Sequence, residues 1–429
     1  MATGIFPKID LRLHDLEAQT KMRSHDPRKA IEDLRDHLAR HDRPLSFLFG
    51  AGTSSSVNVA PVPAPGGKPT YKPLIPAVAR LTEICEESIR TKGTEFGAAW
   101  DAVIAECSVT VTKPNIEDIL SKTRHKIDAI GPGDVLLDLN EDKLIKFEKD
   151  ICETIAKATS PPPDSIPDKL PHDAFALWLK NTTRTNPVEI FTTNYDLLLE
   201  ISLEGSRIPI FDGFIGSYQP FFMPESLERK ELYPSRGWVR LWKLHGSINW
   251  QRAKIKGSHR IIRTQPVLTG EMILPSHRKY DESRKQPYVS LLNRLGNLLD
   301  QEDALLTTCG YSFGDEHINS TLFTCLEGRT RAHVISLQFE DLSETSAVVK
   351  HAIQRKNIVV LARNGAVIGG EWGLWQLLQP VDNASSPFMD VAFDSKAAVD
   401  STSDGLEGMM RLGDFNRFCR FLLTMTPQP

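Results

Sequence analysis

The sequence contains few cysteines, and no two of them form a Cys-x-x-Cys pair. The six are Cys85, Cys107, Cys152, Cys309, Cys325 and Cys419. Zinc ribbons and disulfide-stapled domains both need closely spaced cysteines, so neither class is expected. Isolated thiols suit a reducing compartment. We therefore expect a cytoplasmic protein without a zinc module or other metal site.

Long apolar runs and an excess of basic residues are also missing. No stretch approaches the roughly 20 apolar residues of a membrane-spanning helix, and charges interrupt the N-terminal MATGIFPKIDLRLHD where a secretion signal needs an apolar core. Lys and Arg number 51 against 55 Asp and Glu, a net charge of −4 with neutral histidines. These features predict no membrane association and do not indicate direct nucleic-acid binding, although they leave room for a local basic patch.

Strand and helix patterns alternate along most of the 429 residues. Strands are predicted at 45–49, 188–191, 208–211, 239–244, 304–309, 332–337 and 358–361. Helices are predicted between several of them, at 287–299, 315–326 and 343–354. Such alternation is typical of an α/β fold with a mostly parallel sheet and helices on both faces.

Changes in composition divide the chain into three parts. An N-terminal helical segment occupies residues 1–44, and the main α/β domain occupies residues 45–380. Within that domain, a proline-rich segment precedes a mainly helical insertion at about 77–160. Residues 381–429 are expected to form a polar tail and a final helix at 406–423. The apolar stripe of that helix (Met409, Leu412, Phe415 and Phe418) either docks on the chain's own core or contacts a second subunit.

The first polar motif follows the strand at 45–49 and reads Gly50-Ala51-Gly52-Thr53-Ser54. A glycine turn lets backbone N–H groups approach a diphosphate, and nearby hydroxyls add donors. The third glycine of a G-x-G-x-x-G fingerprint is absent, since Ser55 takes its place. A tight turn without a ligand explains the motif equally well.

The second motif follows the strand at 188–191 and contains Thr193, Asn194 and Asp196. A carboxamide and a carboxylate at a strand end can bind sugar hydroxyls and the nicotinamide amide. The alternative is that Thr193 or Asn194 caps a helix that starts near Tyr195.

Two further motifs also follow strands. Lys243-Leu244-His245-Gly246-Ser247 places an imidazole at a strand end, where it can act as a general base or serve as a hydrogen-bonded structural residue. Cys309-Gly310-Tyr311-Ser312-Phe313-Gly314-Asp315 leads into a helix, and its backbone donors suit a ribose or a phosphate. Four polar motifs at four strand ends are hard to explain as four independent caps.

Taken in order, Gly-Ala-Gly-x-Ser, Thr-Thr-Asn-Tyr-Asp, Leu-His-Gly-Ser and Gly-Tyr-Ser-Phe-x-Asp-x-His-Ile resemble the sirtuin-like domains of prokaryotic anti-phage defence proteins. The pattern is most similar to the sirtuin-like partner of HerA-type ATPases. This resemblance covers residues 45–318 and implies a Rossmann-like fold that binds NAD. It also implies homo-oligomers, a HerA-type ATPase partner and a role in antiviral defence.

The resemblance implies a role for each matching residue. Asn194 would hold the nicotinamide ribose and position a water, with Asp196 near the nicotinamide carboxamide, and Thr193 would also bind the cofactor. His245 would be the general base. Asn115 lies in a segment that also resembles the family, and its role stays open because helix capping explains it as well. The residues implied at the diphosphate and the adenosine side are Gly50, Ala51, Gly52, Ser54, Gly310, Ser312 and Asp315.

One departure from the protein deacylases of the sirtuin class affects the expected activity. Those enzymes carry a four-cysteine zinc module that supports the acyl-lysine cleft, and this chain has no such cysteines. The resemblance then implies an NAD hydrolase that yields nicotinamide and ADP-ribose, with its activity under a switch. The alternatives are a non-catalytic module that binds NAD or ADP-ribose, and a protein deacylase or ADP-ribosyltransferase.

Overall fold

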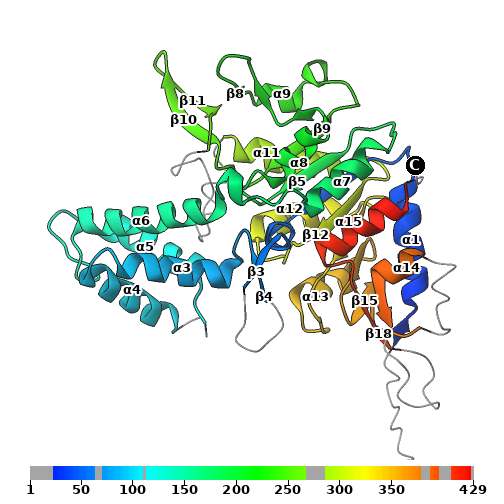
Figure 1. The fold of residues 1–429 in the computed structure, drawn as a ribbon, viewed down its shortest axis with the longest axis horizontal. Helices are drawn as coiled ribbons and strands as arrows, with labels where there is room; N and C mark the ends of the chain where they lie inside the picture. The colour runs from blue at the N-terminus through cyan, green and yellow to red at the C-terminus, as the bar shows by residue number, and fades with distance from the viewer. Residues whose placement is uncertain are drawn as a thin grey trace, which may run out of the picture.

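The computed structural model describes residues 23–62, 70–109, 113–266, 286–377, 387–395 and 407–426. A ten-stranded sheet forms the centre of the molecule (Figure 1). Its strands, in spatial order, are β1 (Ser24–His25), β16 (Glu371–Trp375), β15 (Gly365–Ile368), β14 (Ile358–Leu361), β13 (His333–Leu337), β12 (Leu305–Cys309), β2 (Leu45–Phe49), β5 (Glu189–Thr192), β9 (Val239–Lys243) and β6 (Ile210–Phe211).

The seven strands from β14 to β6 run parallel, whereas β15 pairs antiparallel with both of its neighbours, β14 and β16. At the far end of the sheet, β1 pairs parallel with β16. The chain first passes from β2 to β5, β6 and β9 on one side. It then returns to β12, on the other side of β2, and continues to β13 and β14. The strand order therefore reverses between β2 and β12, which is the place where open α/β sheets bind ligands.

Helices cover both faces of the sheet, so the predicted Rossmann-like α/β fold is confirmed. Alternate residues of β2 enter different cores, because Phe47 and Phe49 face one layer and Leu48 faces the other. One layer contains α1 (Pro27–Ala39), α7 (Pro171–Lys180), α8 (Leu198–Gly205), α14 (Pro387–Ala392) and α15 (Phe415–Thr424). The other contains α11 (Tyr288–Leu299), α12 (Glu316–Leu326) and α13 (Ala347–Gln354).

Four helices project from the body as a separate bundle (Figure 1). Their buried residues, among them Trp100 and Phe147, form a cluster of their own rather than an extension of the sheet core. Amphipathic helices that bury their apolar faces against one another can form such a unit without the sheet. The helices are α3 (Val78–Arg90), α4 (Thr94–Cys107), α5 (Ile116–Ala129) and α6 (Glu141–Thr159).

Three smaller sheets accompany the central sheet in the described part of the chain. A four-stranded sheet contains β10 (Trp250–Ile255), β11 (Ser258–Arg263), β8 (Phe221–Phe222) and β7 (Phe214–Ile215). The two-stranded sheets pair β3 (Asn58–Val62) with β4 (Thr70–Pro73), and β17 (Phe393–Ser395) with β18 (Gly408–Met410).

The C-terminal segment differs from the continuous helix that its apolar stripe predicts. Residues 408–410 form strand β18, and α15 begins only at Phe415, with Asp414 as its N-cap. The amide of Met410 donates to the carbonyl of Arg363, which holds this segment in an extended form. Phe415 and Phe418 are buried in the core of their own chain.

Candidate functional site

The four polar motifs leave the sheet from four neighbouring strands, in the order β12, β2, β5 and β9. Phe49 pairs in register with both Cys309 and Thr192, and Thr192 pairs with Lys243. The residues after these positions therefore start at the same level of the sheet. Because the strands are parallel, all four motifs lie at one carboxyl edge, beside the reversal of strand order.

The two glycine turns at this edge pack directly against each other. A Cβ on Gly50 would lie 2.4 Å from the carbonyl oxygen of Gly310, and a Cβ on Gly52 would lie 2.6 Å from the Gly310 Cα. The amide of Gly52 donates to the Gly310 carbonyl at 3.0 Å. Gly310 itself has a φ of +65°, which favours glycine. The contact between β2 and β12 thus requires glycine at all three positions, whatever the edge binds.

Ser54, Asn194 and Asp196 form a buried hydrogen-bond network that joins the first motif to the second. The Asn194 amide nitrogen contacts the Gly50 carbonyl at 3.1 Å and the Ser54 Oγ at 2.7 Å. The Ser54 hydroxyl donates to Asp196 at 2.6 Å. A hydroxyl has a single proton, so in this structure the Ser54 proton is committed to Asp196. The Gly50 carbonyl can only accept, which fixes the orientation of the Asn194 amide.

The helix-capping alternative for Asn194 does not describe this structure. Helix α8 begins at Leu198, beyond the expected start, and its N-cap residue Leu197 provides no side-chain cap. Asp196 instead accepts the Leu198 amide at 3.1 Å. The Asn194 side chain reaches across to the neighbouring strand end, while Asp196 serves both the helix and Ser54.

Lys243, the first residue of the third motif, to which the sequence pattern assigned no role, supports the same edge. Its ammonium donates to the backbone carbonyl of Asp196 and forms an ion pair with Glu200 at 2.9 Å. Burial raises the pKa of the Glu200 carboxyl, and the Lys243 charge opposes that rise. A lysine at the end of a fully buried strand is the sequence signal for this role, because such a lysine needs a partner.

His245 and Asp315 meet at the edge although they are far apart in the sequence. His245 Nε2 lies 2.9 Å from Asp315 Oδ2, and both side chains are buried. A carboxylate only accepts hydrogen bonds, so it favours the tautomer with the proton on Nε2 and leaves Nδ1 as the basic nitrogen. The other Asp315 oxygen accepts the amides of His317 and Ile318 at the start of α12. Asp315 thereby holds the imidazole against a fixed helix end.

The remaining motif residues differ in exposure, so that some form an exposed rim at the carboxyl edge and others a buried floor beneath it. Ala51 and Ser312 are exposed and Thr193 is half-buried, whereas Asn194 and His245 are each 8% exposed. The ring of Tyr195 lies 6.4 Å from that of His245, which brings the second and third motifs together. An exposed rim over a buried polar floor suits a ligand that lies across the strand ends.

Asn115 lies away from this edge, in the helical bundle. It is the N-cap of α5, where its side chain accepts the Glu117 amide at 2.7 Å. Asp118 accepts the Asn115 amide in return, which completes a capping box. The capping alternative therefore describes the contacts that Asn115 makes.

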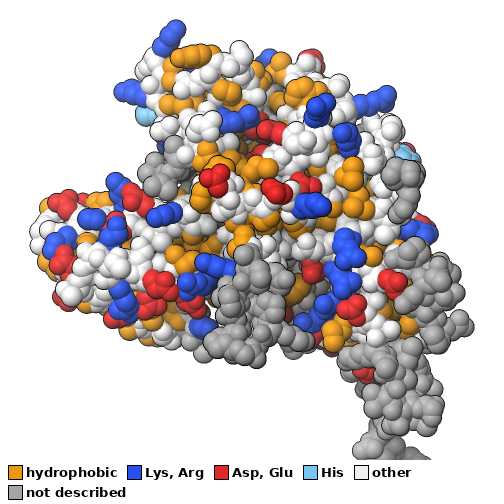
Figure 2. Space-filling view, viewed as in Figure 1, with side chains coloured by type: hydrophobic (Ala, Val, Ile, Leu, Met, Phe, Trp, Pro, Cys, Tyr) orange, Lys and Arg blue, Asp and Glu red, His pale blue; other side chains and the backbone are white. Residues whose placement is uncertain are grey.

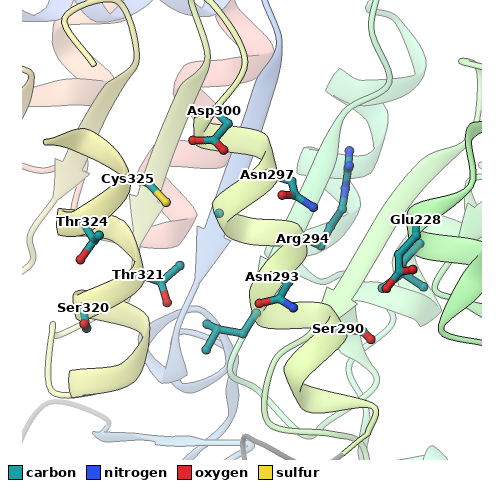
Figure 3. A pocket seen from close by; sticks show the side chains of 13 residues that line it. Glu228, Ser290, Asn293, Arg294, Asn297, Asp300, Ser320, Thr321, Thr324 and Cys325 are labelled. Atoms are coloured by element: carbon teal, nitrogen blue, oxygen red, sulfur yellow. The ribbon is translucent and has the colours of Figure 1, made fainter. Parts of the chain in front are cut away.

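A surface cavity of about 580 Å³ lies elsewhere, between α11, α12 and α9 (Glu225–Glu228) (Figure 3). Polar side chains such as Asn293, Asn297 and Thr321 point into it. None of its lining residues belongs to the four motifs. This cavity is distinct from the carboxyl edge and contributes nothing to the chemistry described above.

The described ranges contain neither a metal-binding cluster nor a membrane-spanning helix. No group of three or more His, Cys, Asp or Glu side chains that could hold a metal ion is present there. All six cysteines lie within those ranges as free thiols. Likewise, no helix in the described part of the chain is long and apolar enough to cross a bilayer.

Comparison with known families agrees with the architecture of the edge. Residues 188–361 match the SIR2-like domain family. The match spans less than half of the chain and includes Asn194, His245 and the turn from Gly310 to Asp315, whereas the Gly50–Ser54 turn lies outside it. No curated protein matches the sequence. A SIR2-like domain implies the use of NAD, and the carboxyl edge is where this sheet would bind it.

Proposed function

We propose that this protein is an NAD hydrolase that cleaves the bond between nicotinamide and ribose. The SIR2-like match supports the use of NAD, and the buried pair of His245 and Asp315 supports a reaction rather than binding alone. A histidine oriented by a carboxylate at a strand end is the arrangement that general-base catalysis needs. This pair is the observation that carries the proposal.

In the proposed reaction the oxygen of one water forms a bond to the ribose C1′. The bond from C1′ to the nicotinamide nitrogen breaks, and nicotinamide leaves as a neutral molecule with the electron pair of that bond. His245 Nδ1 accepts the proton that the water loses, and this proton is later released to solvent. Asp315 keeps Nε2–H in place, and Asn194 holds the turn that faces the ribose. Positioned proton transfer contributes about 10²–10⁴-fold to such a rate.

Product analysis tests the proposal directly. Incubation of the purified protein with NAD should yield nicotinamide and ADP-ribose in equal amounts, without a protein acceptor. Label transferred from NAD to protein, or deacetylation in step with nicotinamide release, would instead indicate the ADP-ribosyltransferase or the deacylase.

The cellular setting belongs to the same proposal. An unrestrained NAD hydrolase would deplete its own cell, so we infer that assembly or a partner controls the activity. The resemblance of the four motifs points to a homo-oligomer and a HerA-type ATPase acting in antiviral defence. Hydrolysis rates measured with and without a co-purified ATPase should differ, and equal rates would exclude that partner as the switch.

One observation favours a second candidate, a binding module without chemistry. Ser54, Asn194 and Asp196 already satisfy one another, as expected of a rigid binding surface. In that case NAD and ADP-ribose would bind, and calorimetry would detect them, but no nicotinamide would appear.

A further inference from the structure

The hairpin of β10 and β11 projects from the body (Figure 1), and its base follows the Lys243–Ser247 motif directly along the chain. Its strands pair antiparallel from Trp250 and Arg263 at the base to Ile255 and Ser258 near the tip. Lys256 and Gly257 form the two-residue turn, with φ values of 48° and 85°. The hairpin is anchored at its base, where Trp250 is buried against Phe214 at a ring distance of 5.0 Å.

The hairpin carries several positive charges and no negative charge of its own. Residues 250–263 contain three Arg, two Lys and one His, and no Asp or Glu. Arg263 pairs with Asp212 at the base. Four further side chains are exposed and form no ion pair with any residue in the described ranges, namely Lys254, Lys256, His259 and Arg260. Figure 2 shows basic and histidine side chains at the tip of the hairpin, with no acidic side chain beside them.

The geometry of the hairpin holds these cations together on a narrow ribbon. Lys254 lies directly opposite His259 in the register, so both project from the same face. The Arg260 guanidinium stacks 5.2 Å from the Phe221 ring centroid, which limits its freedom. At the tip, Lys256 adopts a left-handed backbone conformation. Most turns of this kind have Asn or Gly at such a position, because the conformation costs other residues roughly 1–2 kcal/mol. A lysine at this position places a cation at the most exposed point of the hairpin.

The chemistry of the patch favours a nucleic acid over an acidic protein. Protein interfaces are depleted of lysine and centre on aromatic and apolar side chains, whereas the exposed residues of this hairpin are Gln251, Arg252, Lys254 and 256–260. Phosphate contacts use Lys and Arg, and the major groove of B-form DNA admits a two-stranded β-ribbon. We propose that the β10–β11 hairpin binds the phosphodiester backbone of DNA without sequence specificity, independently of the NAD chemistry proposed above.

Salt-dependent binding to a fluorescent 20-base-pair DNA duplex tests the proposal with the full-length protein. Wild type should bind with a Kd of about 10⁻⁴–10⁻⁶ M at physiological salt and more tightly at 50 mM salt, because non-specific affinity falls steeply as the salt is raised. The variant Lys254→Gln/Lys256→Gln/Arg260→Gln should bind at least about tenfold more weakly at 50 mM salt. Its plot of log K against log salt should be shallower by about 2.7, because each lost phosphate contact removes about 0.9 from the slope.

A matched control removes the same charge elsewhere. Lys143→Gln/Lys149→Gln/Lys157→Gln alters three exposed lysines of α6 and should bind the duplex as wild type does. Equal losses in both triple variants, or no binding by wild type at 50 mM salt, would overturn the proposal. Binding of labelled poly-glutamate of equal charge as tightly as the duplex would also overturn it, in favour of an acidic protein surface. Both variants should remain folded with only a small shift in thermal midpoint, because the altered side chains are exposed. They lose only the packing of Arg260 on Phe221 and the surface ion pairs of Lys143 and Lys149.

Discussion

Replacing Asp315 by Asn separates its contact with His245 from its role at the start of α12. Asn and Asp are about equally good N-cap residues, so the amides of His317 and Ile318 keep an acceptor. The carboxamide cannot reproduce a carboxylate oxygen that lies 2.9 Å from His245 Nε2, because it can also turn its NH₂ toward the ring. With Asn at position 315, the His245 tautomer that carries its proton on Nδ1 is no longer excluded. In that tautomer Nδ1 cannot accept the proton of the attacking water.

Asp315→Asn should lower the rate of nicotinamide release strongly and the free energy of unfolding only slightly. In the serine-protease triad the corresponding Asp-to-Asn change lowers kcat by about 10⁴-fold, and positioned proton transfer in general contributes about 10²–10⁴-fold. We expect Asp315→Asn to lose about 10²–10⁴-fold in kcat for nicotinamide release, with little change in KM. The free energy of unfolding should change by less than about 1 kcal/mol, as for exchange between good N-cap residues. Steady-state assays and urea unfolding measure the two effects on the same sample.

Asp26→Asn is the matched control, because Asp26 is the N-cap of α1, where it accepts the Arg28 amide at 2.9 Å. This variant should keep both activity and stability. If Asp315→Asn retained the wild-type kcat, or lost activity only in proportion to lost folding, Asp315 would be a helix cap and nothing more.

Three further outcomes follow from the buried contacts. Burial lowers the pKa of His172 to about 4, below its unfolded value of 6.5, so stability present above pH 6.5 is lost as the pH falls toward 4. When the pH is lowered from 8 to 5.5, the free energy of unfolding measured in urea should fall by about 1 kcal/mol less in His172→Phe than in wild type. Equal falls in the two proteins would show that protonation of His172 does not cause the acid destabilisation. Gly310→Ala should lower the free energy of unfolding by at least about 2 kcal/mol, because the new Cβ would lie 2.6 Å from the Thr53 nitrogen and the backbone is left-handed. An unchanged thermal midpoint would contradict this close packing of the two turns. Asn194→Ala should cost about 1–3 kcal/mol through its lost buried hydrogen bonds, and unchanged stability would show that the network with Ser54 is dispensable.

The sequence predicts the sheet and the convergence of the four motifs at its carboxyl edge because both depend on local patterns. The apolar runs at 45–49 and 358–361 are strands β2 and β14 within the same bounds. Polar residues directly after such strands share one edge whenever the strands are parallel, so the convergence of the motifs needs no knowledge of strand order. Helix α13 illustrates the limit at element ends, since it starts at Ala347 rather than near residue 343.

Contacts between distant segments could not be predicted from the same patterns. Asp315 follows His245 by many residues, and only the placement of β12 and β9 in one sheet brings them together. The glycine motif could not be explained from the sequence either. A Cβ at Gly50 or Gly52 would clash with the backbone of Gly310, so the close packing of two strand ends requires these glycines whether or not a ligand binds. Strand β18 occupies a stretch with an apolar stripe at helical spacing, since pairing with β17 overrides local propensity.

The most direct test of the account compares nicotinamide release from NAD by wild type and by His245→Gln, each with and without any co-purifying partner. Gln at this position retains an N–H donor for Asp315 but has no basic nitrogen. The account predicts nicotinamide and ADP-ribose from wild type and a rate lower by about 10²–10⁴-fold in the variant, at an unchanged thermal midpoint. Equal rates in the two proteins, or no nicotinamide from wild type under either condition, would contradict it.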